Sequence, residues 1–539
     1  MKKLLLFLLL VLSISIFANG SNNPNNKIYN DIDYWYGLGL IDRLPPIRPY
    51  SSQYIIHILN IIVENGDDQD VIKAKNYLAE YSNTRLDMKV NSKNFYNFDI
   101  PKTVSSFGID ANVNPIKNVY ANIDVNINFM NITDSDFFPA YRELGIDFNI
   151  DDSDFSVMDI DIGMYQGLNM SSSFGNENMW FQSGIMRTGF GPLFSDSVVL
   201  NPSSQQSTHF SYTWMHNNFT LSYLFLPILA SDNEGNDLRD NKYLAIRSYD
   251  FYFTKWWNFQ FFESVIYGRS GVKPEYLIPF GQFFYSAGMS QTLDVNSMMG
   301  ISSVFNLPQN INLKSTLYLD DVNFKEVVKL NFDSKMKLAG QFVGEWNIRS
   351  QVLKTLSLGY TAILPYMYTH IDYEDNSDRV ESDYNENQSF NYQNYTHAGK
   401  TLGPYNMDPN SDKITLVLGT KLPLDLLCNF NLNLIRHGNA TPDDSDSSVN
   451  FPSDGTIFDP GFSSFGRYMY TLSNPFLTQD IIETTLMGSL NISTPNYTLG
   501  SGEISFGAGY TYSFTNNKDL IDGKTQHENL VELSFEYKF

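Results

Sequence analysis

The side chains that most often carry out hydrolysis, His and Ser, occur in this chain without a catalytic spacing. Seven His are scattered over 539 residues, and neither the metal-binding pattern HExxH nor the nucleophile pattern GxSxG is present. Two short stretches, Ser207-Thr208-His209 and Tyr395-Thr396-His397, place a hydroxyl close to an imidazole in sequence. Isolated polar residues in loops are the better interpretation of both stretches. The sequence therefore predicts that the chain is not an enzyme.

Clustered carboxylates offer two further kinds of chemistry. The acidic segment 372–386 supplies oxygen ligands of the kind that Ca²⁺ prefers, but its spacing matches no EF-hand, so a solvated surface loop is the better interpretation. Asp320 and Asp321 could serve glycoside hydrolysis, yet adjacent residues on a strand point to opposite faces. The single Cys, Cys428, permits neither an internal disulfide nor a Cys-based metal site, and it is expected as a small wall residue of a strand. No metal or other cofactor is predicted.

Binding of a sugar is a better prediction than catalysis. Tyr and Trp offer apolar faces to sugar rings, while Asn and Asp form hydrogen bonds with hydroxyls. Tyr392, Asn394 and Tyr395 combine both kinds of side chain within one long connection, and they are the predicted ligand contacts, with Arg187 as a charge in the interior of the fold. Aromatic and Asn residues are abundant throughout the chain, so general composition is the competing explanation.

The composition indicates a protein that is partly in water and partly in lipid. Aromatic residues make up 15% of the chain, with 40 Phe and 34 Tyr, whereas charged residues make up only 18%. A soluble protein carries about 25% charged residues. A mean hydropathy of −0.26 excludes a membrane protein built from helices, which needs several long apolar runs. The net charge of −23 argues against nucleic acid as a partner, because phosphate binding requires clustered Lys and Arg.

The first 18 residues have the features of a secretory signal peptide. Lys2 and Lys3 precede an apolar core, and a small residue, Ala18, comes before a polar stretch. The alternative, a membrane anchor, is disfavoured because the apolar core is too short. A lipoprotein anchor is excluded because no Cys follows the core.

Residues 19–102 are predicted to form a small helical module on the periplasmic side. A short amphipathic piece is expected over 31–44, ended by the prolines that follow it. A second helix is expected to be capped by Ser51 or Ser52 and to end at Gly66. A third places Val71, Ala74, Leu78 and Tyr81 on one face. Such a module is too small to be stable alone and needs a surface to pack on.

From residue 103 to 539 the hydrophobic period changes from 3.6 to 2, which is typical of β-strands with one apolar and one polar face. In 119–129 every odd position is apolar and most even positions are Asn or Asp. A soluble β-sandwich also alternates. A membrane barrel is favoured because polar residues lie within the strands, aromatic residues gather at segment ends and segments of about 9–11 residues recur between short and long connections.

The length of this region allows about 18 strands, so the predicted fold class is an all-β transmembrane antiparallel barrel. The connections 369–412 and 437–480 are very long, and long loops face the outside of the cell. A barrel this wide would enclose an aqueous hole unless these loops or the helical module fill it.

The final strand, 531–539, alternates apolar residues with Glu, Ser and Lys and ends at Phe539. An alternating last strand with a terminal Phe resembles the signal by which barrel-insertion machinery recognises bacterial outer-membrane proteins. Outer-membrane lipid and this machinery are therefore expected partners.

The order of a helical module, a barrel and a terminal Phe resembles the Wzi family of capsule assembly proteins. Four stretches carry the resemblance, in the expected order: Trp35–Ser51 (WYGLGLIDRLPPIRPYS), Met186–Asn201 (MRTGFGPLFSDSVVLN), Leu317–Val322 (LYLDDV) and Tyr395–Leu418 (YTHAGKTLGPYNMDPNSDKITLVL). The resemblance implies an occluded barrel of about 18 strands in the outer membrane, with a periplasmic helical module and a lectin-like, non-enzymatic role in holding capsular polysaccharide at the cell surface. A porin or substrate-specific channel is the alternative, and a hydrolase is the least favoured.

Overall fold

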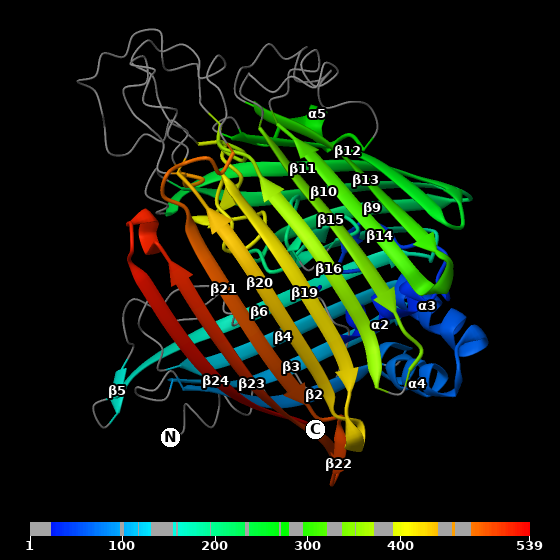
Figure 1. The fold of residues 1–539 in the computed structure, drawn as a ribbon. Helices are drawn as coiled ribbons and strands as arrows, with labels where there is room; N and C mark the ends of the chain where they lie inside the picture. The colour runs from blue at the N-terminus through cyan, green and yellow to red at the C-terminus, as the bar shows by residue number, and fades with distance from the viewer. Residues whose placement is uncertain are drawn as a thin grey trace.

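The computed structural model describes residues 23–82, 84–96, 102–116, 118–130, 155–157, 160–193, 196–231, 237–268, 271–279, 295–320, 337–350, 352–370, 392–439, 455–458 and 476–539. Within these residues the chain forms a wide, tilted β-barrel with a small group of helices at one end (Figure 1). The predicted signal peptide and the acidic segment 372–386 lie outside the described residues.

Three helices form the N-terminal module: α2 (Lys27–Gly37), α3 (Ser52–Asn65) and α4 (Asp68–Ser82). The prediction for α3 is confirmed, since the Ser51 hydroxyl accepts a hydrogen bond from the Tyr54 amide and the helix ends at Gly66. The expected first helix lies earlier than 31–44, because the Asn26 side chain caps it through the Ile28 amide and it ends before the left-handed Gly39. No helix in the described part of the chain is long and apolar enough to cross a membrane.

A closed barrel of eighteen antiparallel strands follows, which confirms the predicted fold class. The strands are β2 (Arg85–Tyr96), β3 (Lys102–Ile116), β4 (Val119–Met130), β6 (Ile160–Gly175), β7 (Met179–Met186), β9 (Ser207–His216), β10 (Phe219–Ser231), β11 (Asp237–Thr254), β12 (Trp257–Gly268), β13 (Val295–Leu307), β14 (Ile311–Leu319), β15 (Leu338–Asn347), β16 (Leu353–Ile363), β19 (Ser411–Lys421), β20 (Leu427–His437), β21 (Glu483–Ser493), β23 (Gly502–Asn516) and β24 (Thr525–Lys538). Each pairs with the next, and β24 pairs with β2 to close the wall.

The remaining elements are short. They are β1 (Ile47–Arg48) paired with β8 (Gly189–Phe190), β5 (Phe155–Val157) beside β6, β17 (Thr396–His397) paired with β18 (Lys400–Thr401), β22 (Tyr497–Leu499) beside β23, the helix α5 (Pro274–Leu277), and single turns at Pro308–Asn310, Pro423–Asp425 and Lys518–Leu520. Cys428 lies in the wall strand β20 and is half-buried.

The barrel begins at Arg85, whereas the sequence predicted a module that extends to residue 102. Strand β2 has only a short alternation of Leu86, Met88 and Val90 before Ser92 and polar residues replace the apolar positions, so its period is weak. Its pairing with β24 and β3 fixes it as a wall strand nevertheless.

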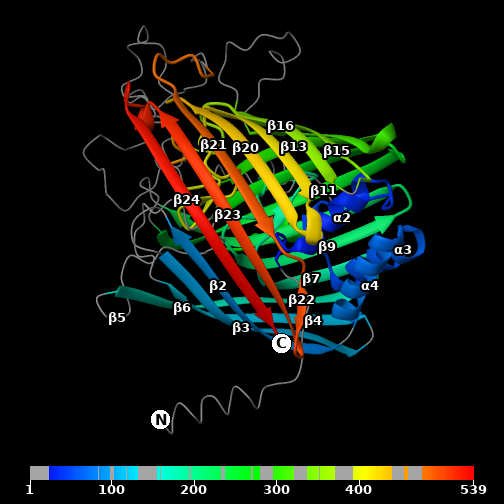
Figure 2. The same cartoon turned by 60° about the horizontal axis from the view of Figure 1, so that its bottom comes forward.

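The helical module packs against the barrel end that carries the short turns. Gln53 Nε2 donates to the Asn118 carbonyl at 3.1 Å, the Arg43 guanidinium donates to the Asn217 carbonyl, and the Tyr34 hydroxyl donates to the Ile348 carbonyl at 3.2 Å. All three acceptors lie in tight turns between strands, and Figure 2 shows the module at this end. Short turns face the periplasm in outer-membrane barrels.

Aromatic side chains gather at the short-turn end of the outer wall. Trp256 stacks on Trp257 with a centroid distance of 6.3 Å, and Phe253 and Phe305 lie beside Trp257 at 4.8 and 5.9 Å. Trp256 and Phe253 are exposed. Amphipathic rings at the edge of an apolar band are typical of a membrane interface, so this cluster supports the aromatic belt that the sequence indicated.

Buried tyrosines make the module sensitive to alkaline pH. Burial raises the pKa of Tyr50 to about 12, with Arg48 opposing the shift, whereas an unfolded Tyr has a pKa of about 10. The folded module keeps this proton longer than the unfolded chain does, so its stability is constant below about pH 10 and falls as the pH rises toward about 12.

We expect the urea midpoint of module unfolding, followed by Trp fluorescence, to fall steeply above about pH 10. The contribution of Tyr50 is on the order of 1.4 kcal/mol per pH unit in that window. Tyr50→Phe should make the decline shallower, and an equal decline in both proteins would contradict the assignment.

Candidate functional site

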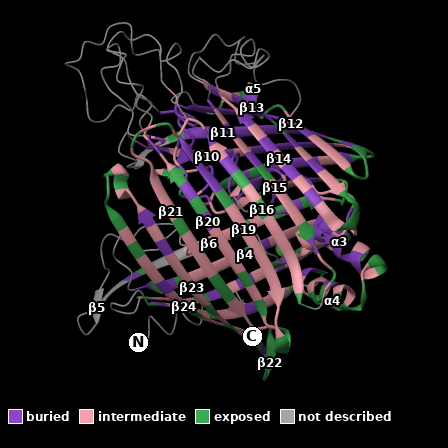
Figure 3. Cartoon of the chain, in the orientation of Figure 1, coloured by how far each residue is buried: buried purple, intermediate pink, exposed green. Residues whose placement is uncertain are grey.

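The two sides of the barrel interior differ in chemistry. On β10 the inner positions are Leu224, Leu226 and Ile228, all buried, whereas the inner positions of β20 are Asn429, Asn431 and Asn433. Figure 3 shows the same difference along the wall, with buried residues concentrated in β10–β14 and half-buried or exposed residues on β19–β24. One side of the lumen is therefore a packing surface, and the other is a polar wall.

An apolar core lies inside the lumen against the packing surface. It joins the inner faces of β10–β16 to two segments of chain that fold inward, the inner loop (the described residues 187–193 and 196–206) and the inner strap (residues 392–403). Its fully buried members include Phe190, Val198, Val199 and Leu200 from the inner loop, Tyr395 and Leu402 from the inner strap, and Leu224, Leu244, Ile246, Phe262, Ile266, Met298 and Tyr318 from the wall. Burial of apolar area is the main source of folding free energy, so these segments are held firmly.

Backbone hydrogen bonds link the module, the inner loop and the inner strap. Strand β1 of the module pairs with β8 of the inner loop, with Ile47 opposite Phe190. The Gly191 amide donates to the Pro46 carbonyl at 2.9 Å, and the Asn201 amide donates to the Leu402 carbonyl at 2.8 Å. A continuous plug thus runs from the short-turn end into the lumen.

Lys242 of β11 anchors the inner strap. Its ammonium is completely buried and donates to the Asn394 carbonyl at 2.7 Å, to Asn394 Oδ1 at 2.8 Å and to Thr396 Oγ1 at 3.2 Å. His397 adds a second anchor, because its Nδ1 accepts from the Leu229 amide at 3.0 Å and its Nε2 donates to the Gln206 carbonyl at 3.0 Å. The amide donor fixes the tautomer that carries the proton on Nε2.

The three predicted ligand contacts on the strap are buried within the protein. The Tyr392 hydroxyl donates to the Asn241 carbonyl at 3.0 Å, and the ring lies so close to Gly268 that a Cβ there would overlap it. Asn394 binds Lys242, and Tyr395 stacks on Tyr368 at 5.3 Å. Burial raises the pKa of Tyr395 and Tyr368, so both phenols stay neutral.

The fourth predicted contact, Arg187, is also buried. Its guanidinium donates to the carbonyls of Ser203 and Ser204 at 2.9 and 3.3 Å, so it braces the inner loop from within. It lies in the interior, where the sequence suggested a charge. The hydrogen bonds and ring contacts of these four residues are all with other residues of the same chain. Their contact with a ligand stays a prediction.

The two His stretches do not form a hydrolytic arrangement. His209 was expected in a loop but lies in β9, completely buried, with Nδ1 at 2.8 Å from Thr188 Oγ1 and Nε2 at 2.7 Å from Ser211 Oγ. Its location follows from the alternation of β9, which points this side chain inward. Asp320 pairs with Lys337 at 3.6 Å, and Asp321 lies outside the described residues. Across the residues that the structure describes, no group of three or more His, Cys, Asp or Glu is placed to hold a metal ion.

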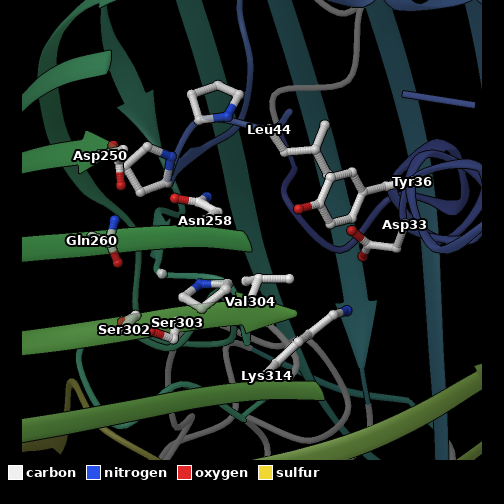
Figure 4. Close-up of a pocket in the computed structure, with 14 residues that line it drawn as sticks. Asp33, Tyr36, Leu44, Asp250, Asn258, Gln260, Ser302, Ser303, Val304 and Lys314 are labelled. Carbon is white, nitrogen blue, oxygen red and sulfur yellow. The ribbon is translucent and has the colours of Figure 1, made fainter. Parts of the chain in front are cut away.

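A small polar cavity lies where the module, the inner loop and the wall meet (Figure 4). It has a volume of about 30 Å³, which is room for about two water molecules and too little for a sugar ring. Asp250, Asn258, Gln260 and Lys314 line it from the wall. The sequence analysis missed this group, because its members come from three strands whose register is not visible in the sequence.

The polar wall of β19–β24 was also not singled out. Asn429 and Asn491 are directly opposite each other on β20 and β21 and both are exposed, with Asn431 and Ser489 in the next inner row. Amide and hydroxyl groups of this kind form hydrogen bonds with sugar hydroxyls. Asn at the alternate positions 429, 431 and 433 was the feature of the sequence that could have indicated this polar wall.

Replacing Lys242 by Met is expected to loosen the inner strap. The change takes a charged donor away from a buried carbonyl, an amide oxygen and a hydroxyl. The Thr396 amide and hydroxyl still donate to Asn394, so the expected cost is on the order of 1–3 kcal/mol in total. Limited proteolysis of the detergent-solubilised protein should then cut within 392–403 faster than in the wild type. Lys255→Met, at a side chain that is 88% exposed, is the matched control, and equal cleavage of both variants would contradict the anchoring role.

No protein-family model and no curated protein matches the chain. Among solved structures, the chain is similar to Wzi, an outer-membrane protein of Escherichia coli that is involved in group 1 capsule assembly and is described as a carbohydrate-binding β-barrel. The TM-score is 0.57 at 12% identity, covering 97% of this chain and 99% of Wzi. OprD and OccK10 of Pseudomonas aeruginosa align with TM-scores of 0.44 and 0.42 at 9% identity, covering 84% of this chain and 94% and 98% of theirs. Over almost its whole length, the chain has the outer-membrane β-barrel fold of Wzi, as the resemblance of its sequence implied.

Proposed function

We propose that this protein is a non-enzymatic barrel of the bacterial outer membrane that binds or organises polysaccharide at the cell surface. The observation that carries the proposal is the apolar core inside the lumen, which joins the wall, the inner loop and the inner strap. A lumen that packed side chains occupy along β10–β16 is not an open, wide diffusion path. The shared fold with a carbohydrate-binding barrel of capsule assembly supports the same role.

The alternative function is that of a porin or substrate-specific channel. A channel needs a continuous aqueous path, and porins provide it with polar interiors. The polar wall of β19–β24 favours this alternative, whereas the plug beside β10–β16 opposes it.

The first experiment deletes the gene and measures polysaccharide in the cell-bound and medium fractions. We expect polysaccharide to move from the cells to the medium while total synthesis is unchanged. Reintroduction of the gene should restore the cell-bound fraction. An unchanged distribution together with reduced uptake of a small solute would overturn the proposal in favour of a channel.

A further inference from the structure

The cavity in Figure 4 has a carboxylate at one end with an unusual set of neighbours. Asp250 of β11 lies opposite Gln260 of β12, and Gln260 lies opposite Ser302 of β13. Side chains directly opposite on one face of antiparallel strands have Cβ atoms about 4.5–5.5 Å apart. Asn258 precedes Gln260 by two residues and shares its face, so four oxygen-bearing side chains meet at this point.

Two of these oxygen atoms have no hydrogen-bond donor. Gln260 Oε1 and Asn258 Oδ1 are both buried without a partner, and the whole Gln260 side chain is only 4% exposed. The Gln260 amide nitrogen donates to Ser248 Oγ at 3.0 Å and to the Asp250 carboxylate, which leaves its oxygen for the cavity. A buried acceptor without a donor destabilises the fold by about 1–3 kcal/mol unless a ligand or water satisfies it.

Among the described residues, no base is placed to balance a negative charge on Asp250. Asp250 is 2% exposed and accepts a hydrogen bond from Ser248 Oγ at 3.3 Å, and no Lys, Arg or His of the described residues forms an ion pair with it. The other charged groups of the cavity are already paired, Asp33 with Arg48 and Lys314 with Glu345 at 3.1 Å. An ionised carboxylate is rarely buried without a positive partner.

The cover of the cavity supplies few donors. Three prolines without an amide hydrogen, Pro45 and Pro46 of the module and Pro192 of the inner loop, close it together with Leu44 and Tyr36. The one glycine beside them, Gly191, already donates its amide to the Pro46 carbonyl. The donors that face Asp250, the Ser248 hydroxyl and the Gln260 amide, are neutral, and the oxygens of Gln260 and Asn258 remain unpaired, which is an environment that suits a hard cation.

We propose that this cavity binds a monovalent metal cation, Na⁺ or K⁺, through the Asp250 carboxylate and the amide oxygens of Gln260 and Asn258. One unbalanced negative charge matches one positive charge, whereas Ca²⁺ sites commonly use several carboxylates and Mg²⁺ keeps an octahedral water shell. A volume of about 30 Å³ accommodates one such ion with a single water. The bound cation joins the module, the inner loop and the wall at one point.

The test uses the full chain in detergent at constant ionic strength, with NaCl or KCl exchanged for N-methylglucamine chloride. We expect the melting temperature of the wild type to rise by several degrees as the metal cation replaces the organic one. Asp250→Asn should abolish this response and should be at least as stable as the wild type in N-methylglucamine. The same substitution at the exposed Asp42 is the matched control and should leave the response unchanged.

A second variant keeps the proposal testable if Asp250→Asn does not fold. Gln260→Met preserves length but removes the unpaired oxygen, and it should shift the midpoint of the cation response to about tenfold higher concentration. Crystals soaked with Tl⁺ should show anomalous density beside Asp250. A wild-type melting temperature that does not distinguish Na⁺ or K⁺ from N-methylglucamine would overturn the site and indicate a protonated acid. A response to Ca²⁺ alone would overturn its monovalent character.

Discussion

Replacing the inner strap, residues 392–403, by a Gly/Ser linker of equal length is expected to convert a closed barrel into a conducting one. The linker removes Tyr395 and Leu402 from the core in the lumen. The carbonyl of residue 402, which accepts from the Asn201 amide, is then no longer held in place, so the inner loop also loses a support. Gly and Ser bury too little apolar area to replace these contacts. In planar bilayers, the wild type should give no resolved current steps, whereas the variant should give discrete, steady steps.

The matched control replaces the exposed turn 518–524, between β23 and β24, with the same kind of linker. This turn lies outside the core, so the control should remain closed. Both variants should keep the difference in gel migration between heated and unheated samples that marks a folded barrel. Current steps in the wild type would contradict occlusion itself, and a closed but folded strap variant would mean that the other segments suffice to close the lumen.

The wall of the barrel could be predicted from the sequence because one physical rule generates it. A strand with lipid on one side and water on the other must alternate, and 119–129 and 531–539 do so clearly. The capping of α3 by Ser51 follows from local chemistry in the same way. Strand β2 escaped prediction because it has only three apolar positions in alternation, and its pairing with a strand more than 400 residues away fixes it.

The filled lumen was harder to predict because it depends on contacts between distant segments. Strand β10 carries the signal that was available, since Leu224, Leu226 and Ile228 are apolar on the face opposite to Leu221 and Phe225. A strand that is apolar on both faces is buried on both. From the sequence alone, such an apolar run is explained by contact of the outer face with lipid. The sequence does not show which distant segment packs against the inner face.

The candidate residues are buried inside the protein, whereas those of the long connection were expected to be exposed, and their contact with a ligand stays a prediction. Tyr392, Asn394 and Tyr395 were expected on an exposed loop because aromatic and Asn residues suit sugar binding, yet the loop turns into the lumen and Lys242 holds it there. Such a contact between residues 242 and 394 leaves no local pattern. Asp250 and Gln260 escaped for the same reason, because only the register of β11 and β12 brings them together.

Arg48→Met is expected to release the helical module from the barrel. The guanidinium is 2% exposed, forms an ion pair with Asp33, donates to the Tyr50 hydroxyl at 3.3 Å, and lies over the rings of Tyr29 and Tyr50 at 4.9 and 5.4 Å. Although burial lowers its pKa, the Asp33 carboxylate raises the pKa above the usual value, so the group remains charged. Arg48 also lies in β1, opposite Gly189 of the inner loop.

Met keeps the apolar stem and removes every charged contact. Loss of one partner of a fully buried ion pair destabilises a protein by about 3–5 kcal/mol. Asp33 retains contact with water because its side chain is 35% exposed, so a loss of about 2–3 kcal/mol is expected. Urea unfolding followed by the fluorescence of Trp35 of the module and Trp180 of β7, which pack in one core, should then show an early transition before the barrel unfolds.

Arg43→Met provides the control within the same module. Arg43 is only partly buried, and its main contact is one hydrogen bond to the Asn217 carbonyl, so its loss should leave a single transition. Asp33→Asn combined with Arg48→Met should be less destabilising than the sum of the two single changes, since each single change leaves the other group unpaired. If Arg48→Met unfolded in one step at the wild-type midpoint, the module would be held by its apolar contacts alone, and the buried ion pair would have no role in docking the plug.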